Sequence, residues 1–492
     1  MGVMLRTVLK WVAIGLAVIV LTAAALFALG LRVVLYGGGT PRLQFVESER
    51  TRDERLARSR AAQRDAQAAP AARLVNPTAA APASVEAAPP TARATADLVM
   101  LPPPAAYWTD FRGPLRDGHY RERTIRTAWP AGGLTPLWKQ PVGGGYASFV
   151  SAGERAFTIE QRGPREVVAA YDVASGRELW ATGWDTVFRE SMGGDGPRAT
   201  PTWADGRVYA LGGAGELRAL DEASGRTVWR TNILADAGAS NLQWGMAAAP
   251  LVVDNTVVVV PGGRNGQSVV AYDRASGARV WAALDDQGAY ASPMLVTIGK
   301  VRQILIFSAA RLAGITPGGD RVLWEYPWRT NFDVNASQPL LISDNRIFVS
   351  TGYGTGAAVI ELTPSAEGFT VREIWRNIRM KNQFASSVLH EGFIYGLDES
   401  ILACLDAATG AVKWKGGRYG YGQVLLASGH LIVLTEEGEL VLVRATPESH
   451  QELARSPALQ GKTWNHPAMT DGYLLVRNGN EMAAFDLRQP DR

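Results

Sequence analysis

Short apolar runs alternate with glycine-containing turns over most of the chain, a pattern typical of β-strands and hairpins. Four stretches of this pattern match one another residue by residue: AYDVASGRELW (170–180), ALDEASGRTVW (219–229), AYDRASGARVW (271–281) and CLDAATGAVKW (404–414). In each, an apolar strand ends at an Asp, a Ser/Thr-Gly pair turns the chain, and a second strand brings a Trp eight positions after the Asp. A hairpin precedes three of the four, so each unit holds about four strands, as one propeller blade does.

Weaker copies of the unit fill the gaps between these four. Leu323-Trp324 and Ile374-Trp375 end units without the Asp turn, and residues 425–444 form a unit without a final Trp. The last unit, residues 469–487, stops before its Trp strand, and LTPLWKQPV near residue 138 is the candidate for the missing strand. Pairing between the two chain ends would close the ring and leave no open sheet edge.

These units predict an all-β, eight-bladed β-propeller over residues 105–492. Seven blades would carry a tryptophan on the final strand and one would lack it. The final-strand tryptophans are Trp138, Trp180, Trp229, Trp281, Trp324, Trp375 and Trp414.

The N-terminus has a different pattern. Trp11–Leu31 is a stretch of 21 residues without charge, long enough to cross a bilayer as a helix. We expect a cytoplasmic segment at residues 1–10 and a single transmembrane helix at residues 11–35, which anchors the chain in a bacterial inner membrane with the propeller in the periplasm. A cleavable signal peptide with a processing site near Ala23–Ala25 is the alternative. The flanking arginines and lysines are nearly balanced, so orientation is inferred from the short basic N-terminus.

Residues 36–104 are predicted to be a linker. Charges of both signs crowd residues 47–69, which favours a solvated helix or a disordered arm, with a partner-binding or lipid-headgroup stalk as the alternative. Residues 70–104 are rich in Ala and Pro and bury too little apolar surface to fold. We expect an extended tether that holds the propeller away from the membrane.

Composition excludes several classes of function. A net charge of +3 is too small to indicate nucleic-acid binding. The single cysteine, Cys404, excludes a disulfide within the chain and a cysteine-based metal cluster. The five histidines lack metal-ligand spacing and no Gly-x-Ser-x-Gly nucleophile motif occurs, so we expect no metal site and identify no catalytic residue.

The cassette resembles the tryptophan-docking repeat of eight-bladed propellers of the pyrroloquinoline-quinone (PQQ) type. WTDFRGPLRDGHY (108–120) is similar to the opening segment of bacterial PQQ-binding-like repeat proteins. The resemblance implies that each Trp packs against a small residue and a Gly of the neighbouring repeat. Cys404 stands where the other cassettes have Ala, which favours a packing role over a nucleophilic one.

Family members include both enzymes and scaffolds. The resemblance implies that a quinoprotein dehydrogenase would hold PQQ and calcium at the propeller mouth, between a Trp and a disulfide of adjacent cysteines, with a carboxylate base. This chain cannot form that disulfide and has no haem-attachment Cys-x-x-Cys-His. We therefore expect no cofactor and a non-enzymatic scaffold that binds envelope proteins, by analogy with the family's propeller lipoprotein that assists outer-membrane β-barrel assembly. A PQQ-dependent dehydrogenase acting on an alcohol or sugar remains the alternative.

Residues just before each innermost strand should converge at the channel mouth. They are rich in amides and aromatics, which suits ligand or peptide recognition; the alternative is that they close the funnel and satisfy strand ends. The candidates are Asp195, Arg198, Gln243, Trp244, Tyr290, Asn331, Asn335, Asn382, Gln383, Tyr421, Trp464, Asn465 and His466.

Overall fold

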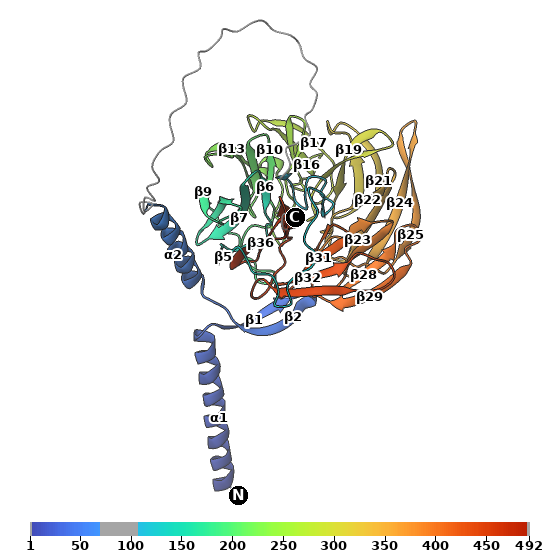
Figure 1. Cartoon of the computed structure of the whole chain (residues 1–492). Helices are drawn as coiled ribbons and strands as arrows, with labels where there is room; N and C mark the ends of the chain where they lie inside the picture. The colour runs from blue at the N-terminus through green and yellow to red at the C-terminus, as the bar shows by residue number, and fades with distance from the viewer. Residues whose placement is uncertain (1, 69–106, 490–492) are drawn as a thin grey trace.

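Eight four-stranded antiparallel blades surround a central channel in the computed structural model, which describes residues 2–68 and 107–489 (Figure 1). In blades 1 to 7 the strands follow chain order from the channel outward. Blade 1 has β6 (Val150–Ala152), β7 (Arg155–Arg162), β8 (Arg165–Asp172) and β9 (Glu178–Asp185). Blade 2 has β10 (Thr202–Ala204), β11 (Arg207–Leu211), β12 (Glu216–Asp221) and β13 (Thr227–Asn232), followed by the short helix α3 (Ile233–Ala237).

The next three blades continue round the ring. Blade 3 has β14 (Leu251–Val253), β15 (Thr256–Val259), β16 (Val269–Asp273) and β17 (Arg279–Ala283). Blade 4 has β18 (Met294–Ile298), β19 (Val301–Phe307), β20 (Arg311–Ile315) and β21 (Val322–Pro327). Blade 5 has β22 (Leu340–Ser343), β23 (Arg346–Thr351), β24 (Gly356–Ser365) and β25 (Gly368–Asn377).

The last three blades bring the chain back to its start. Blade 6 has β26 (Val388–His390), β27 (Phe393–Asp398), β28 (Ile401–Asp406) and β29 (Val412–Arg418). Blade 7 has β30 (Gln423–Ala427), β31 (His430–Leu434), β32 (Glu439–Arg444) and β33 (Glu452–Pro457). Blade 8 has β34 (Ala468–Thr470), β35 (Tyr473–Arg477), β36 (Glu481–Asp486) and, as its outer strand, β5 (Trp138–Pro141) from the other end of the domain.

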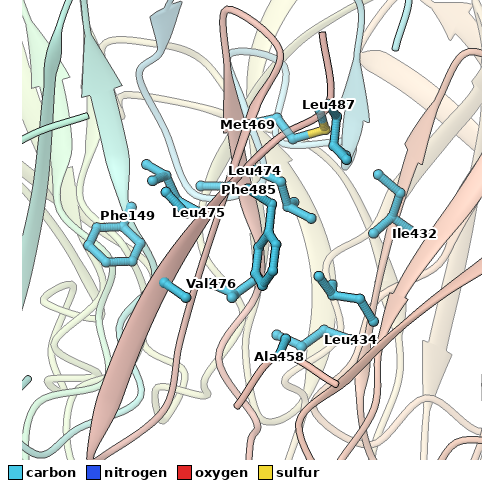
Figure 2. Close-up of a cluster of buried hydrophobic side chains, with 14 of the residues drawn as sticks. Phe149, Ile432, Leu434, Ala458, Met469, Leu474, Leu475, Val476, Phe485 and Leu487 are labelled. Carbon is cyan, nitrogen blue, oxygen red and sulfur yellow. The ribbon is translucent and has the colours of Figure 1, made fainter. Parts of the chain in front are cut away.

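The predicted eight-bladed fold and its closure are confirmed. Trp138 pairs with Ala484, so the outer strand of the last blade comes from the start of the propeller. The blades pack through apolar side chains, and the largest cluster joins blades 7, 8 and 1; Figure 2 shows Phe149 and Phe485 in it. Because apolar burial is the main favourable term in folding, this cluster stabilises the ring where the two chain ends meet.

Local chemistry explains the repeated turn between the two outer strands. In blade 2 the Asp221 carboxylate accepts hydrogen bonds from the backbone N–H and the hydroxyl of Ser224, at 2.9 and 2.6 Å. Gly225 follows with φ of +69°, a conformation that costs a glycine little. This turn places Trp229 opposite Ala219 in the β12–β13 ladder.

The tryptophans join consecutive blades. The Trp180 indole lies against Gly225 of the next blade and donates to the Glu222 carbonyl at 2.8 Å. The same bond to a carbonyl of the next blade is made by Trp138, Trp229, Trp375 and Trp414, while Trp281 packs on Gly319. Trp324 differs, because its indole donates to Gln303 of its own blade.

The N-terminal region begins with α1 (Gly2–Ala28), which Figure 1 shows pointing away from the propeller. Within the described residues, one helical stretch, Thr7–Ala28, is long and apolar enough to cross a membrane, and none of its most apolar window is buried. The helix ends before the predicted limit at residue 35, because Gly30 turns the chain and alternating residues then form β1 (Leu31–Tyr36).

The expected linker is partly folded onto the propeller. After β1, the turn η1 (Gly37–Gly39) leads into β2 (Thr40–Phe45), which pairs with β1, and α2 (Glu49–Ala68) follows. We call residues 31–68 the strap. Residues 49–68 form a helix, one of the two expected forms, and this helix packs against β5 and buries Leu56 and Arg60. The expected extended tether at residues 70–104 lies outside the described residues.

Candidate functional site

One face of the propeller gathers the loops that lead into the innermost strands, together with the turns between the second and third strands. We call this face the mouth. Four residues before the inner strands β6, β18, β26 and β34 stand aromatic residues: Tyr146, Tyr290, Phe384 and Trp464. Arg198 occupies the same position, four residues before β10. A repeated structural position therefore supplies aromatic or cationic side chains from five blades.

The aromatic side chains at the mouth contact one another across blade boundaries. The Trp464 ring centroid lies 4.7 Å from that of Phe384 and 5.4 Å from that of Tyr146. Phe384 also lies 6.0 Å from Tyr421, and on another sector Trp244 lies 5.5 Å from Tyr290. These rings form a partly exposed aromatic surface that no single blade could build.

Two cations sit among these rings. The Lys462 ammonium lies 4.2 Å from the centroid of the Trp464 ring and donates to the Gly193 carbonyl at 2.5 Å. Burial lowers the pKa of Lys462 to about 8. Arg198 lies 5.4 Å from the centroid of the Tyr146 ring, and burial lowers the pKa of its guanidinium. Cation–π contact compensates part of the lost hydration of both groups.

Three carboxylates of the mouth loops are already engaged. Glu436 accepts from the Trp464 indole at 2.8 Å and from the backbone N–H of Tyr421 at 3.1 Å. Glu190 accepts from the backbone N–H of Met192 at 2.7 Å and from the two following N–H groups. Asp195 accepts from the N–H of Glu190 at 2.9 Å and pairs with an arginine. Glu190 and Asp195 therefore order their own loop, whereas Glu436 joins its turn to the loops that lead into β30 and β34.

The structure divides the sequence-predicted mouth residues into two groups. Those in contact with the aromatic surface or exposed beside it are Asp195, Arg198, Gln243, Trp244, Tyr290, Asn331, Gln383, Tyr421 and Trp464. Those buried below it are Asn335, Asn382, Asn465 and His466.

The buried residues satisfy strand ends and do not present a ligand surface. Asn335 donates to the Ser308 carbonyl at 2.7 Å, and Asn465 donates to the Ala147 carbonyl at 2.9 Å. Burial and a neighbouring arginine lower the pKa of His466 to about 3, so its ring is neutral at physiological pH. Sequence reasoning missed Tyr146, Phe384, Lys462 and Glu436, although the fixed offset before the inner strand was visible for the first two.

The segment 107–120, which we call the plug, lies within the channel. Its strand β3 (Tyr107–Trp108) pairs with β6, and β4 (His119–Tyr120) pairs with β30, so the plug lies on the inner sides of blades 1 and 7. The Arg112 guanidinium, 1% exposed, donates to the Ser387 carbonyl at 2.7 Å and lies 3.2 Å from the His466 ring.

A second plug arginine serves the opposite side of the channel. Arg116 donates to the Pro293 carbonyl at 2.8 Å and to Thr202 at 3.3 Å, and pairs with Asp110 at 2.9 Å. Through Arg112 and Arg116 the plug therefore reaches the inner ends of blades 2, 4, 6 and 8. These side chains fill the channel beneath the mouth.

The strap contacts the mouth from outside. The backbone N–H of Gly37 donates to Glu436 at 2.6 Å, and Lys462 donates to the Leu35 carbonyl at 3.4 Å. A Cβ at Gly37 would lie 2.0 Å from the Tyr421 ring, so only glycine permits this approach. A cavity of about 380 Å³ remains between the hairpin and the loops of blades 6 and 7.

Comparison with known proteins gives two kinds of relative. The chain is 22% identical to outer membrane protein assembly factor BamB of Yersinia pestis over 351 residues, which are 70% of this chain and 75% of that one. It is 29% identical to quinohemoprotein alcohol dehydrogenase ADH-IIG of Pseudomonas putida over 171 residues. That match is 33% of this chain but only 23% of the dehydrogenase.

The fold also matches solved structures. A europium-containing methanol dehydrogenase superposes with a TM-score of 0.59 over 78% of this chain and 98% of its own. The two sequences are 13% identical, so this match supports the fold alone. The model of one protein family matches residues 164–416, more than half of the chain. The chain therefore belongs to the PQQ_2 family, whose description is outer membrane protein assembly factor BamB.

Proposed function

We propose that this protein is a membrane-anchored, non-enzymatic interaction module of the bacterial envelope, which binds polypeptide segments of envelope proteins at the mouth. One observation carries the proposal: the mouth is an aromatic surface with two cations among its rings, and its carboxylates are already engaged by groups of the mouth loops. Aromatic side chains are enriched where proteins bind one another, because they bury a large area with little loss of side-chain freedom.

The filled channel supports this proposal. Arg112 and Arg116 occupy the space under the mouth with hydrogen bonds to several blades, so a partner would meet a shallow surface. Chain segments suit such a surface because they offer backbone groups for Gln243 and Gln383 and side chains for the rings. The similarity to BamB of Yersinia pestis, whose name describes outer membrane protein assembly, agrees with partners in the envelope.

A PQQ-dependent dehydrogenase is the second candidate, because one relative is a quinohemoprotein alcohol dehydrogenase. In the described residues no group of three His, Cys, Asp or Glu side chains is placed to hold a metal. Glu190, Asp195 and Glu436 are engaged as loop acceptors, and Cys404 is buried under Trp414 within blade 6. These residues do not fit a calcium-bound quinone, and we derive no reaction step through one.

Site-specific crosslinking in cells tests the proposed function. A photo-crosslinking amino acid replaces Gln243, an exposed mouth residue, and in a matched strain it replaces Ser175, an exposed residue in a turn at the other end of blade 1. We expect a reproducible adduct with an envelope protein from position 243 and none from position 175. Equal adducts from both positions, or none from position 243, would contradict the proposal.

A ligand experiment separates the second candidate. Purified full-length protein receives PQQ and calcium, and its thermal unfolding and dye-linked oxidation of alcohols and sugars are measured. We expect no change in Tm and no oxidation. A ligand that binds only the folded state raises its Tm. A rise in Tm with PQQ and calcium, together with oxidation of an alcohol or sugar, would therefore contradict the interaction module and support a dehydrogenase.

A further inference from the structure

The strap hairpin has one face made only of apolar residues. Successive side chains in a strand point to opposite sides, so alternate residues of β1 and their partners in β2 share a face. Val33, Leu43 and Phe45 on this face are 63%, 69% and 69% exposed. The three cross-strand pairs that form the face are Leu31–Phe45, Val33–Leu43 and Leu35–Pro41.

The opposite face of the hairpin carries mostly polar residues and is bound to the propeller. Tyr36 is buried and accepts a hydrogen bond from Gln44 at 2.6 Å. Arg42 forms an ion pair with Glu437 of the β31–β32 turn. The polar face is thus fixed on the mouth side of blade 7, and this orientation turns the apolar face outward.

The apolar face continues directly from α1. The membrane-competent stretch Thr7–Ala28 has 22 residues and would be about 33 Å long as a helix, close to the thickness of a bilayer core. Only Leu29 and Gly30 separate it from β1, and Figure 1 shows the hairpin lying between α1 and the blades. Arg32 stacks on the Phe27 ring at 3.7 Å, so a charged group lies beside the C-terminal end of the apolar helix.

We propose that the hairpin is a membrane-interface element whose apolar face rests in the lipid headgroup region and holds the mouth toward the bilayer. The proposal rests on the membrane anchoring in the proposed function. A lipid surface is the occupant that the structure favours, because an apolar face that starts two residues after a spanning helix lies at interface depth without further ordering. The mouth would then meet partner segments close to the membrane.

Depth-resolved fluorescence in lipid vesicles tests this proposal with the full chain. In a Cys404→Ala background, the separate variants Leu43→Cys, Ile14→Cys and Ser175→Cys each carry an environment-sensitive dye on the new cysteine. Ile14 reports on α1 and Ser175 on the opposite face of the propeller. We expect lipids with a shallow spin label to quench the dye at position 43 at least about twofold and aqueous iodide to quench it little. The dye at position 14 should respond to deep labels and that at position 175 to iodide.

The outcomes separate this inference from the anchoring on which it rests. If position 14 is quenched by lipid while position 43 responds to iodide as position 175 does, the hairpin proposal is wrong and the anchor stands. If iodide also quenches the dye at position 14, or if that segment has been cleaved off, both the hairpin proposal and the membrane anchor are wrong. If position 43 loses its protection when the protein is diluted to single copies per vesicle, a second copy covers the face, and the lipid proposal is wrong.

Discussion

Arg60 is the residue through which α2 should hold to the propeller, and Arg60→Ala tests this directly. Its side chain is 4% exposed. The guanidinium donates to the Gln140 side chain at 2.9 Å and to the Pro141 carbonyl at 3.1 Å. It also donates to the Tyr171 hydroxyl at 3.3 Å and pairs with Glu178 at 3.1 Å.

The size of the effect follows from these contacts. Breaking a buried ion pair by removing one partner costs about 3–5 kcal/mol. Glu178 keeps a second partner, since Arg162 lies 2.6 Å away, so the remaining carboxylate is not left unpaired. We therefore expect the lower end, a loss of about 3 kcal/mol in docking of α2, which corresponds to about a 100-fold increase in the population of the detached helix.

Hydrogen exchange of full-length protein in lipid nanodiscs measures this population. Backbone amides of residues 49–68 exchange when α2 opens locally, so their protection should fall by about 100-fold in Arg60→Ala. Arg58→Ala is the matched control, because Arg58 is exposed on the same helix and loses the same atoms. Its protection should change by less than about threefold.

Two results would refute this reasoning. Equal exchange in Arg60→Ala and Arg58→Ala would mean that the buried guanidinium does not hold the strap. A large fall in protection throughout blades 1 and 8 would mean that Arg60 stabilises the propeller itself, with the strap as a passive attachment. Exchange confined to residues 49–68 is the result that supports a separable strap.

Three further predictions concern the propeller and use urea unfolding in detergent. Burial raises the pKa of the Glu166 carboxyl from 4.5 to about 7. Between these two values the folded state keeps a proton that the unfolded chain loses. The free energy of unfolding should therefore fall by about 3 kcal/mol from pH 4.5 to 7. Glu166→Gln should remove this pH dependence, and a variant whose free energy of unfolding still falls with pH in the same way would contradict the prediction. Gly225→Ala should cost about 1–3 kcal/mol more than Gly266→Ala, because both glycines have positive φ but only at Gly225 would the methyl meet Trp180, at 2.4 Å; equal costs would refute the docking argument. Arg116→Ala should cost about 3–5 kcal/mol, because it removes the ion-pair partner of Asp110 and a donor to buried carbonyls; a loss below about 1 kcal/mol would show that Arg116 does not stabilise the propeller.

The blade number and the ring closure were predictable because the interactions that define them are local or repeated. The Asp221–Ser224 turn forms within four residues, and its copies at Asp172, Asp273 and Asp406 behave in the same way. Trp324 shows where this reasoning stops. Its unit lacks the Asp turn, and its indole bonds to Gln303, a residue of the same blade that no cassette pattern indicates.

The sequence predicted which side of the ring the mouth residues occupy, but not which of their side chains are exposed and which are buried. Chain position before an inner strand told which side of the ring a residue occupies, and this was sufficient for Trp244 and Tyr290. It did not tell whether a side chain points outward or down into the ring, and the amides of Asn335 and Asn465 point to buried carbonyls. That direction depends on neighbours from other blades, which a single-sequence pattern does not contain.

The strap was the part of the fold that the sequence pattern predicted least well. The alternation in LRVVLYGGGTPRLQF was a hairpin signal, but the preceding apolar run extended the expected helix over it. In α2 the sequence offers several similar arginines, and nothing local distinguishes Arg60 from Arg58. The difference comes from Gln140, Tyr171 and Glu178, residues at least 80 positions away along the chain. A highly charged segment is therefore not evidence of a free linker until its cations have been matched to buried acceptors elsewhere in the fold.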